Sequence, residues 1–228
     1  MDWMLKSKYI AMCEGDDYWT DEYKLNRQVE FLETHPQHSA LAENAIEYFT
    51  ETGNSQLFSE EPARDITIPE LIEKRRFATA SILYRSGVAD LYFKVRHAYD
   101  TMLWCILASK GKLYYNAAVS SVYRRGPGVT MAKDFYAFAK MEEDRINELN
   151  QYFHEHFKPK QVEKIIVKNY VIAANRYLKQ KKWNNNIMLC YKAALKTDWK
   201  LTFIAFYKSF VLVTIKKVVH NFKKLGLK

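Results

Sequence analysis

The chain has 228 residues, of which 48% are hydrophobic and 27% charged, and it carries a formal net charge of +9. This balance is that of an ordinary globular protein with one or two domains, and the low content of Gly and Pro (7 and 5) disfavours a Gly-rich all-β design. Three cysteines lie far apart without a CxxC pair, which excludes a disulfide scaffold or a cysteine zinc site and indicates a reducing, cytoplasmic location.

Positive charge is concentrated in the C-terminal part of the chain. Residues 135–228 hold 19 Lys and Arg against 7 Asp and Glu, whereas residues 1–134 hold 16 against 19. A basic zone suits anionic lipid, nucleic acid or a phosphorylated substrate, and a solvated helical surface explains it equally well. No signal-peptide pattern is present, and the longest apolar run, 201–215, is broken by Lys208 and is too short to span a bilayer comfortably.

The first predicted element is a strand at 9–13. This short apolar run ends abruptly in Glu14, Asp16 and Asp17, a pattern typical of a buried parallel strand with polar residues at its carboxyl end. In open α/β sheets, ligands bind at that end.

The next elements follow from their boundary residues. Asp21 is the expected N-cap of a helix at 22–34, which His35-Pro36 ends and which carries Leu25, Val29 and Leu32 on one face. The remaining expectations to residue 130 are a strand at 40–50, a loop at 52–65, a helix at 68–74 opening at Pro69, an apolar segment at 77–85, a helix at 100–110 closed by Gly111, strands at 112–115 and 119–123, and a basic turn at 124–130.

From residue 135 the pattern is helical almost to the end. The periodicity predicts helices near 135–157, 161–182, 186–197 and 199–224. Residues 169–197 have a tetratricopeptide-like helix pair, which we interpret as a helical appendage because one pair is too few for a solenoid. His154 and His156 are two apart on a helix and point away from each other, so they form a poor metal chelate.

The acidic stretch at 14–19 carries the most chemical information. Carboxylates at the end of a buried strand repel each other and are costly unless a cation neutralises them. Oxygen ligands of this kind suit Mg²⁺ or Mn²⁺, which can in turn bind a diphosphate. An acidic loop that enters a helix is the alternative, and the residues alone favour it slightly. An EF-hand is excluded because Asp21 stands where that loop requires Gly.

Four ordered segments resemble the family 2 (GT-A-type) glycosyltransferases. The likeness lies within residues 1–130, in the order K-Y-I-A-M-C-E-G-D-D-Y-W-T-D at 8–21 with the following K-L and Q-V-E-F-L, F-A-T-A-S-I-L-Y-R at 77–85, D-T-M-L-W at 100–104, and V-Y-R at 122–124. The resemblance implies a partial GT-A α/β domain at 1–134, followed by an α-helical region at 135–228.

The resemblance also implies a role for each matching position. Asp100 would be the general base that deprotonates the acceptor hydroxyl; from the residues alone, a helix N-cap is the preferred interpretation of this Asp. Glu14 and Asp16 occupy the D-x-D positions. The other implied roles are metal and diphosphate binding by Asp16 with support from Asp17, closure over the diphosphate by Tyr123 and Arg124, and shaping of the acceptor pocket by Trp19 and Arg85.

The implied activity is an inverting, metal-dependent sugar transfer. The donor would be a nucleotide sugar, the acceptor a glycan or a lipid-linked glycan, as in cell-surface polysaccharide synthesis, and the cofactor Mg²⁺ or Mn²⁺. Two features depart from the family pattern: the loop after Arg124 has no His to help ligate the metal, and no nucleotide-binding strand–helix–strand unit precedes residue 9. The second departure predicts an N-terminally truncated chain, so the alternative is an inactive fragment or interaction module that needs a complementary N-terminal chain.

The basic tail after the aromatic residues Phe203, Phe206 and Phe210 leaves two interpretations open. It fits a helix lying on anionic lipid at the cytoplasmic face of a membrane, or a helix packed on the catalytic domain with a solvated basic end. Nucleic-acid binding is disfavoured, since no recognised module is present.

Overall fold

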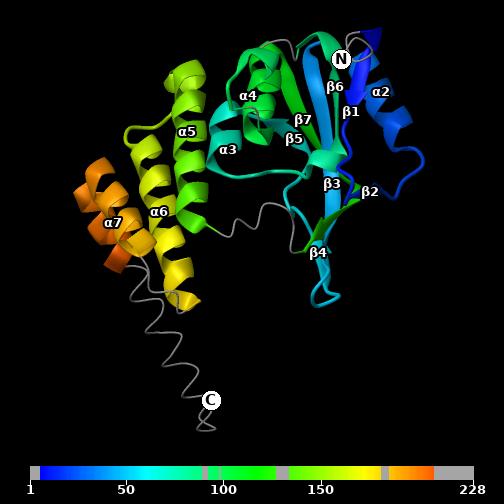
Figure 1. Ribbon diagram of the computed structural model, residues 1–228. Coiled ribbons are helices and arrows are strands. Elements are labelled where there is room, and N and C mark those ends of the chain that lie inside the picture. Colours follow the sequence, from blue (N-terminus) through cyan, green and yellow to red (C-terminus); the bar gives the residue numbers. More distant parts are fainter. Residues whose placement is uncertain (1–5, 89–91, 98, 127–133, 181–184, 208–228) are drawn as a thin grey trace. The chain divides into compact units, whose positions relative to one another are not determined.

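The computed structural model describes residues 6–88, 92–97, 99–126, 134–180 and 185–207. The chain divides into two compact units, Met1–Met131 and Ala132–Lys228. The first unit has the mixed α/β fold that the sequence predicts, and the described part of the second is helical (Figure 1).

The first unit is built on a seven-stranded sheet with the main order β1-β6-β3-β7-β2. The two longest strands, β3 and β7, run parallel at its centre, and all the other pairs are antiparallel. Strands β4 and β5 add to β3 and β7 respectively. The strands are β1 (Tyr9–Ala11), β2 (Tyr18–Trp19), β3 (His38–Phe49), β4 (Ser55–Leu57), β5 (Arg64–Ile66), β6 (Ile82–Arg85) and β7 (Lys112–Arg125).

Helices cover both faces of this sheet. Helix α2 (Lys24–Thr34) lies on one side, and α3 (Ile68–Glu73) and α4 (Asp100–Lys110) lie on the other (Figure 1). Short 3₁₀ turns connect them: η1 (Thr79–Ser81), η2 (Ser86–Val88) and η3 (Tyr92–Lys94).

The core explains why these helices form where they do. Leu32 of α2 packs with Leu41 and Leu83, and Leu25 and Val29 lie against this cluster, so the predicted apolar face is confirmed. Six consecutive residues of α4, 102–107, are buried, because this helix is covered all round. Its predicted ends at Asp100 and Gly111 are also confirmed.

Several predicted strands differ in the structure. Strand β1 is an antiparallel, partly buried strand at one end of the sheet order, paired with β6, instead of a buried parallel strand. Strand β7 is continuous through 112–125 because register shifts in its pairing with β3 accommodate the irregular stretch that separates the two predicted strands. The predicted loop at 52–65 contains β4 and β5, and the predicted turn at 124–130 begins inside β7, with 127–130 outside the described residues.

Helix α2 begins two residues later than predicted. The Asp21 side chain accepts a hydrogen bond from the Tyr23 amide (2.8 Å), so it organises the turn before the helix, and Tyr23 is the N-cap. Helix α3 begins at Ile68 as predicted, with Pro69 in its first turn, and a capping box between Thr67 and Glu70 stabilises that turn.

The described residues of the second unit form three long helices and a fourth helical segment at 199–207. The first three are α5 (Phe135–Phe153), followed by the turn η4 (His154–His156), α6 (Gln161–Lys179) and α7 (Asn185–Thr197). Their core includes Leu149, Val167, Tyr170 and Ala174. The predicted helix ends at 181–182 and 208–224 lie outside the described residues. Among the helices described, none is long and apolar enough to cross a membrane.

Candidate active site

The acidic stretch forms a tight turn between two strands of the first unit. The chain leaves β1, and the Asp17 amide donates to the Glu14 carbonyl (3.0 Å) before β2 pairs with β7. Because Tyr18 lies opposite Val122 in that pair, the acids come to lie beside the end of β7. The Arg124 amide donates to Asp17 Oδ1 (2.9 Å), and the Arg124 guanidinium donates to the Asp16 carbonyl.

Asp100 lies at the first turn of α4, and its carboxylate faces two polar side chains. The Thr79 hydroxyl donates to Asp100 Oδ2 (3.0 Å), and one Nη of Arg75 lies 3.7 Å from the same oxygen. Helix α4 takes Tyr99 as its N-cap, without a side-chain cap hydrogen bond, so Asp100 does not have the capping role that its position suggests. Its side chain is 42% exposed and is therefore accessible to a bound molecule.

Arg75 connects Asp100 to Tyr123. Its guanidinium donates to the Thr79 hydroxyl (3.0 Å) and to the Tyr123 hydroxyl (3.2 Å), and its Cζ lies 4.8 Å from the centre of the Tyr123 ring. Arg75 was not predicted as a site residue, because within the run Lys74-Arg75-Arg76 it is indistinguishable from a solvated surface charge. Only its contacts in the folded chain single it out.

The carboxylates of this cluster interact electrostatically. Burial raises the pKa of Glu14, and the nearby charges of Asp100 and Asp17 raise it further, while Arg75 opposes them. Burial likewise raises the pKa of Asp17, with a contribution from Asp16 that the Arg124 amide, Arg75 and the Arg124 side chain oppose. Glu14, in the turn after β1, is therefore close enough to Asp100 of α4 to feel its charge, so the acids of the turn and of the helix face a common site.

A cation would relieve this repulsion. Asp17 is 8% exposed, and its Oδ2 is buried without a hydrogen-bond partner among the described residues. Within the described part of the chain, no three His, Cys, Asp or Glu side chains are arranged to hold a metal by themselves. A hard cation at this turn would take at most two carboxylates from the described residues, and its other oxygen ligands would have to come from a phosphate ligand and water.

Trp19 follows the acidic turn on β2, and a buried lysine packs against its ring. Its indole N–H donates to the Ala80 carbonyl (2.8 Å), and the ring stays 38% exposed. Lys24 is fully buried, with Nζ 4.9 Å from the Trp19 ring centre and 2.7 Å from Gln28 Oε1. The Gln28 amide in turn donates to the Ser81 carbonyl (2.8 Å), so α2, η1 and Trp19 are fixed together.

Arg85 lies away from the acidic turn. It pairs with Tyr9 at the start of β1, whereas Glu14 follows the end of that strand, so the antiparallel register places the two at opposite ends. Its guanidinium donates to the carbonyls of His38 and Leu32. The structure therefore gives Arg85 a role in joining β6, β3 and α2, and does not bring it to the site for which the sequence analysis proposed it.

A polar hollow of about 450 Å³ borders Arg75 on another side. In its wall, Glu61 accepts from Arg76 (2.6 Å) and forms an ion pair with Lys74 (2.9 Å), and these cations together with Arg64 hold the pKa of Glu61 at about 2. The lining residues are Phe58, Ser59, Glu60, Glu61, Pro62, Lys74, Arg75 and Arg76.

Comparison with known proteins shows similarity in sequence to curated proteins and similarity in fold to a solved structure. No family model matches the chain. The chain is 32% identical over 133 residues to the Escherichia coli UDP-Glc:alpha-D-GlcNAc-diphosphoundecaprenol beta-1,3-glucosyltransferase WfaP, a match that covers 57% of this chain and 51% of that protein. It is 33% identical over 108 residues to an uncharacterized protein of Mycobacterium tuberculosis, covering 41% of this chain and 30% of that protein.

A solved structure shows the same fold. The crystal structure of S. aureus TarS 1-349 in complex with UDP-GlcNAc superposes with a TM-score of 0.55 at 13% identity, covering 98% of this chain and 70% of the TarS chain. The chain thus spans about half, or less, of the length of the curated relatives it matches. In fold, and more weakly in sequence, it is similar to glycosyltransferases.

Proposed function

We propose that this chain carries the acceptor and leaving-group side of a family 2, GT-A-type glycosyltransferase site. The reaction would be an inverting transfer of a sugar from a nucleotide-sugar donor to a glycan or lipid-linked acceptor, in cell-surface polysaccharide synthesis. The observation that carries the proposal is that the acidic turn after β1, held to β7 by the Arg124 amide, lies close enough to Asp100 of α4 for Glu14 to interact with its charge. The name of the relative WfaP, which specifies UDP-Glc and a diphosphoundecaprenol-linked acceptor, supports this substrate class.

The side chains have complementary roles in this reaction. Asp100 accepts the proton of the acceptor hydroxyl as that oxygen forms a bond to the anomeric carbon. The bond from that carbon to the diphosphate oxygen breaks, and the nucleoside diphosphate leaves. Tyr123 and Arg124 lie beside the acidic turn, where Arg124 can hold the departing phosphate oxygens.

Mg²⁺ or Mn²⁺ would bind at the acidic turn together with the diphosphate. Asp16 would be its protein ligand, with Asp17, whose Oδ2 is unpaired in the described structure, in support. When bound, such an ion neutralises the charge that develops on the leaving diphosphate. The protein's own groups position the reacting side chains. Thr79 orients Asp100 through its hydrogen bond, and Arg75 holds Thr79 and Tyr123 in place.

The acceptor would enter through the polar hollow next to Arg75. Arg75 forms one wall of the hollow, and its guanidinium is 3.7 Å from Asp100, so this side chain is all that the proposal needs to move for a glycan hydroxyl to approach the base. Phe58 lines the same hollow, and its ring lies 5.8 Å from that of Tyr123. An aromatic wall with charged neighbours suits a sugar ring, which has apolar faces and a polar rim.

The experiment is a transfer assay with UDP-glucose and a diphosphoundecaprenol-linked GlcNAc acceptor, read by release of UDP. Asp100→Asn keeps the shape of the side chain and removes the base, so we expect a loss of at least about 100-fold in turnover with UDP affinity unchanged. Glu73→Gln, which removes an exposed carboxylate from the neighbouring α3, is the matched control. Equal turnover in wild type and Asp100→Asn would refute the assignment of the base.

The second candidate is an interaction module that works with a separate nucleotide-binding chain. The observation in its favour is that β1 ends the sheet order, with β6 on one side and no further strand paired to its other side in the described residues. An edge of this kind can take up another strand. Activity that appears only when a nucleotide-binding domain is supplied in trans would favour this candidate over the first.

A further inference from the structure

The 199–207 helix of the second unit exposes an aromatic face. Its four aromatic residues are spaced at i, i+4, i+7 and i+8, so they lie on one side of the helix. They are exposed to 59%, 62%, 48% and 69% respectively, whereas Thr202 between them is 4% exposed and faces the bundle. The aromatic face consists of Trp199, Phe203, Phe206 and Tyr207.

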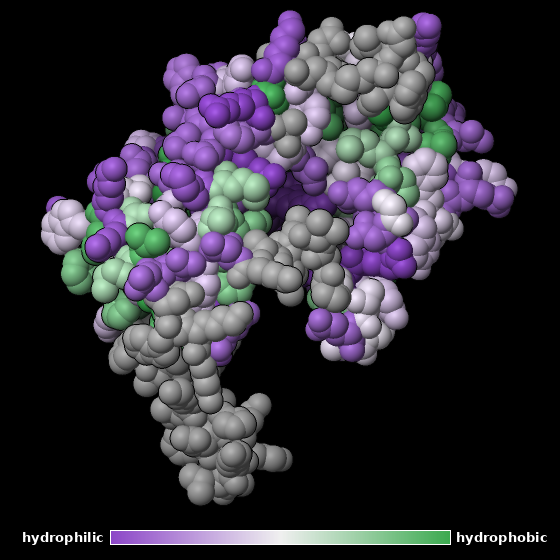
Figure 2. Space-filling view, in the orientation of Figure 1, coloured by the Kyte–Doolittle hydropathy of each residue, from purple (hydrophilic) through white to green (hydrophobic). Residues whose placement is uncertain are grey.

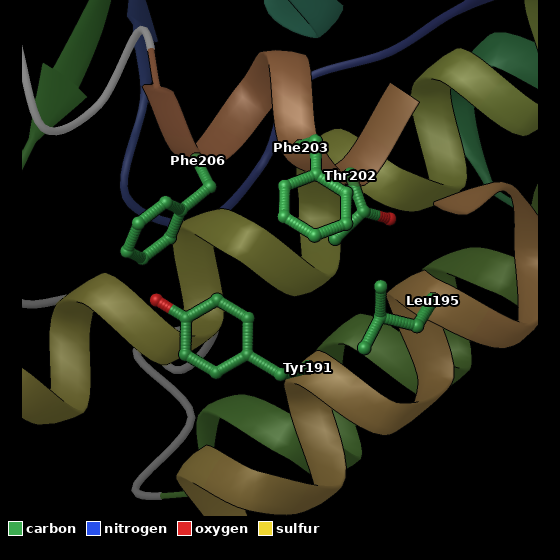
Figure 3. Close-up of a pocket in the computed structure, with 5 residues that line it drawn as sticks. All are labelled: Tyr191, Leu195, Thr202, Phe203 and Phe206. Atoms are coloured by element: carbon green, nitrogen blue, oxygen red, sulfur yellow. The ribbon is translucent and has the colours of Figure 1, made fainter. Parts of the chain in front are cut away.

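A hollow of about 230 Å³ opens beside this face, between the 199–207 helix and α7. Figure 3 shows the rings of Phe203 and Phe206 from one helix and the side chains of Tyr191 and Leu195 from the other turned toward this common space. The Thr202 hydroxyl, which completes the lining, donates to the Asp198 carbonyl (2.7 Å) and does not need a ligand. The hollow therefore presents apolar surface to its contents.

Positive charge flanks the apolar surface. Lys192 and Lys196 lie on α7, and Lys200 has its Nζ 5.5 Å from the Trp199 ring centre. The nearby acid, Asp198, is 15% exposed at its side chain, caps the Leu201 amide (2.9 Å) and lies 3.5 Å from Lys160, so it adds little negative charge to the surface. Residues 208–228 continue the sequence with six lysines and no Asp or Glu.

The same region is visible as a mixed surface. Figure 2 shows hydrophobic side chains gathered over α7, with hydrophilic ones around them. The helix also exposes Ile204 (52%), and α7 exposes Met188 (60%) and Leu189 (40%). Soluble surfaces seldom gather so many large apolar side chains unless they contact a partner or a membrane.

We propose that the aromatic face docks on an anionic lipid surface. Aromatic rings prefer the boundary between headgroups and acyl chains, and lysines beside them pair with lipid phosphates. The hollow would accept part of an acyl chain, a ligand that requires an apolar space and no directed hydrogen bonds. Charge complementarity favours an anionic bilayer because the cations lie beside the apolar surface and the nearby acid is neutralised. This inference does not depend on the proposed sugar transfer.

The test is co-sedimentation of the full chain with vesicles of phosphatidylcholine alone or with about a third phosphatidylglycerol. We expect binding to the anionic vesicles only, weakened by salt. The double variant Phe203→Ala/Phe206→Ala should bind about tenfold more weakly, because it removes two interfacial rings and leaves the charge unchanged.

Tyr23→Ala is the matched control, because Tyr23 is 64% exposed in the first unit and its loss removes a similar aromatic surface. This variant should bind like wild type, and far-UV circular dichroism verifies that both variants fold. No binding to anionic vesicles, or equal weakening by Tyr23→Ala, would overturn the proposal. So would self-association in gel filtration that disappears in the double variant, because the face would then be an interface between two copies of the chain.

Discussion

Replacing Lys24 by Met tests the most unusual burial in the first unit. Lys24 is fully buried, and desolvation lowers the pKa of its ammonium group from 10.5 to about 8, against opposing contributions from Glu43 and Cys13. One pKa unit corresponds to about 1.4 kcal/mol, so keeping this lysine protonated in the folded protein costs about 3 kcal/mol relative to the unfolded chain. Lys24→Met keeps the apolar stem and removes the ionisable group.

The pH dependence of stability reports this cost. Between about pH 8 and pH 10.5 the unfolded chain binds the Lys24 proton and the folded chain has released it, so the free energy of unfolding rises with pH. From about pH 7 to about pH 9.5, we expect wild type to gain about 2 kcal/mol relative to Lys24→Met. The loss of the hydrogen bond to Gln28 costs about 1–3 kcal/mol at every pH, so it shifts the difference without changing its slope.

Urea unfolding of both proteins across this pH range measures the difference directly, and the subtraction removes the titration of other groups. Lys110→Met, at an exposed position on α4, controls for the removal of one positive charge. Parallel stability curves for wild type and Lys24→Met would refute the argument that burial lowers this pKa.

Three further predictions concern the site. Arg75→Gln should lower turnover at least about tenfold, because it breaks the link between the acids and the aromatic wall. Lys110→Gln, at an exposed position on α4, also removes one positive charge and should change turnover little; steady-state kinetics compares the two variants. Arg85→Ala should lower the free energy of unfolding by about 2–4 kcal/mol, because it removes the charged hydrogen bonds to the His38 and Leu32 carbonyls, and it should leave UDP affinity unchanged. A variant that is as stable as wild type but no longer binds UDP would contradict the structural role of Arg85. Burial raises the pKa of Glu14 and Asp17, so these carboxylates take up protons as the pH is lowered from neutral, and the affinity for UDP with Mn²⁺ should fall. Calorimetry at several pH values measures this affinity, and an affinity that does not change with pH would contradict the prediction.

The elements with strong local signals were predicted from the sequence. Helices α2 and α4 have clear stop signals, His35-Pro36 and Gly111, and their apolar residues are spaced or clustered as buried helices require. Gly111 has an additional reason to lack a side chain, since an added Cβ would lie 3.0 Å from the Ser39 backbone nitrogen and side chain. Such signals lie within a few residues of the element they define.

Features that depend on distant partners could not be predicted in this way. Strand β4 is short and all three of its residues are exposed, so it has no buried apolar face, and it forms because it pairs with β3. The antiparallel direction of β1 comes from β6, more than seventy residues further along the chain. Nothing local to β1 specifies that direction, which is why the parallel assignment was wrong.

Some residues of the candidate site could likewise be predicted from the sequence, and others could not. The acidic turn after β1 was singled out from the residues themselves, whereas its D-x-D role and the base role of Asp100 came from the family resemblance. In the structure, Glu14 of this turn interacts with the charges of Asp17 and Asp100. Arg75 was missed because its significance lies in contacts to Thr79 and Tyr123. Arg85 was included by resemblance alone, and the strand register places it at the other end of β1.

The most direct test of the proposed function is isothermal titration of the purified chain with UDP and Mn²⁺, beside the Asp16→Ala variant. We predict binding to the wild type that depends on Mn²⁺ and is lost on chelation and in the variant, because Asp16 lies in the turn that would hold the metal and the diphosphate. A folded wild-type chain that does not bind UDP with Mn²⁺, or an Asp16→Ala variant that binds as tightly as wild type, would contradict the proposal.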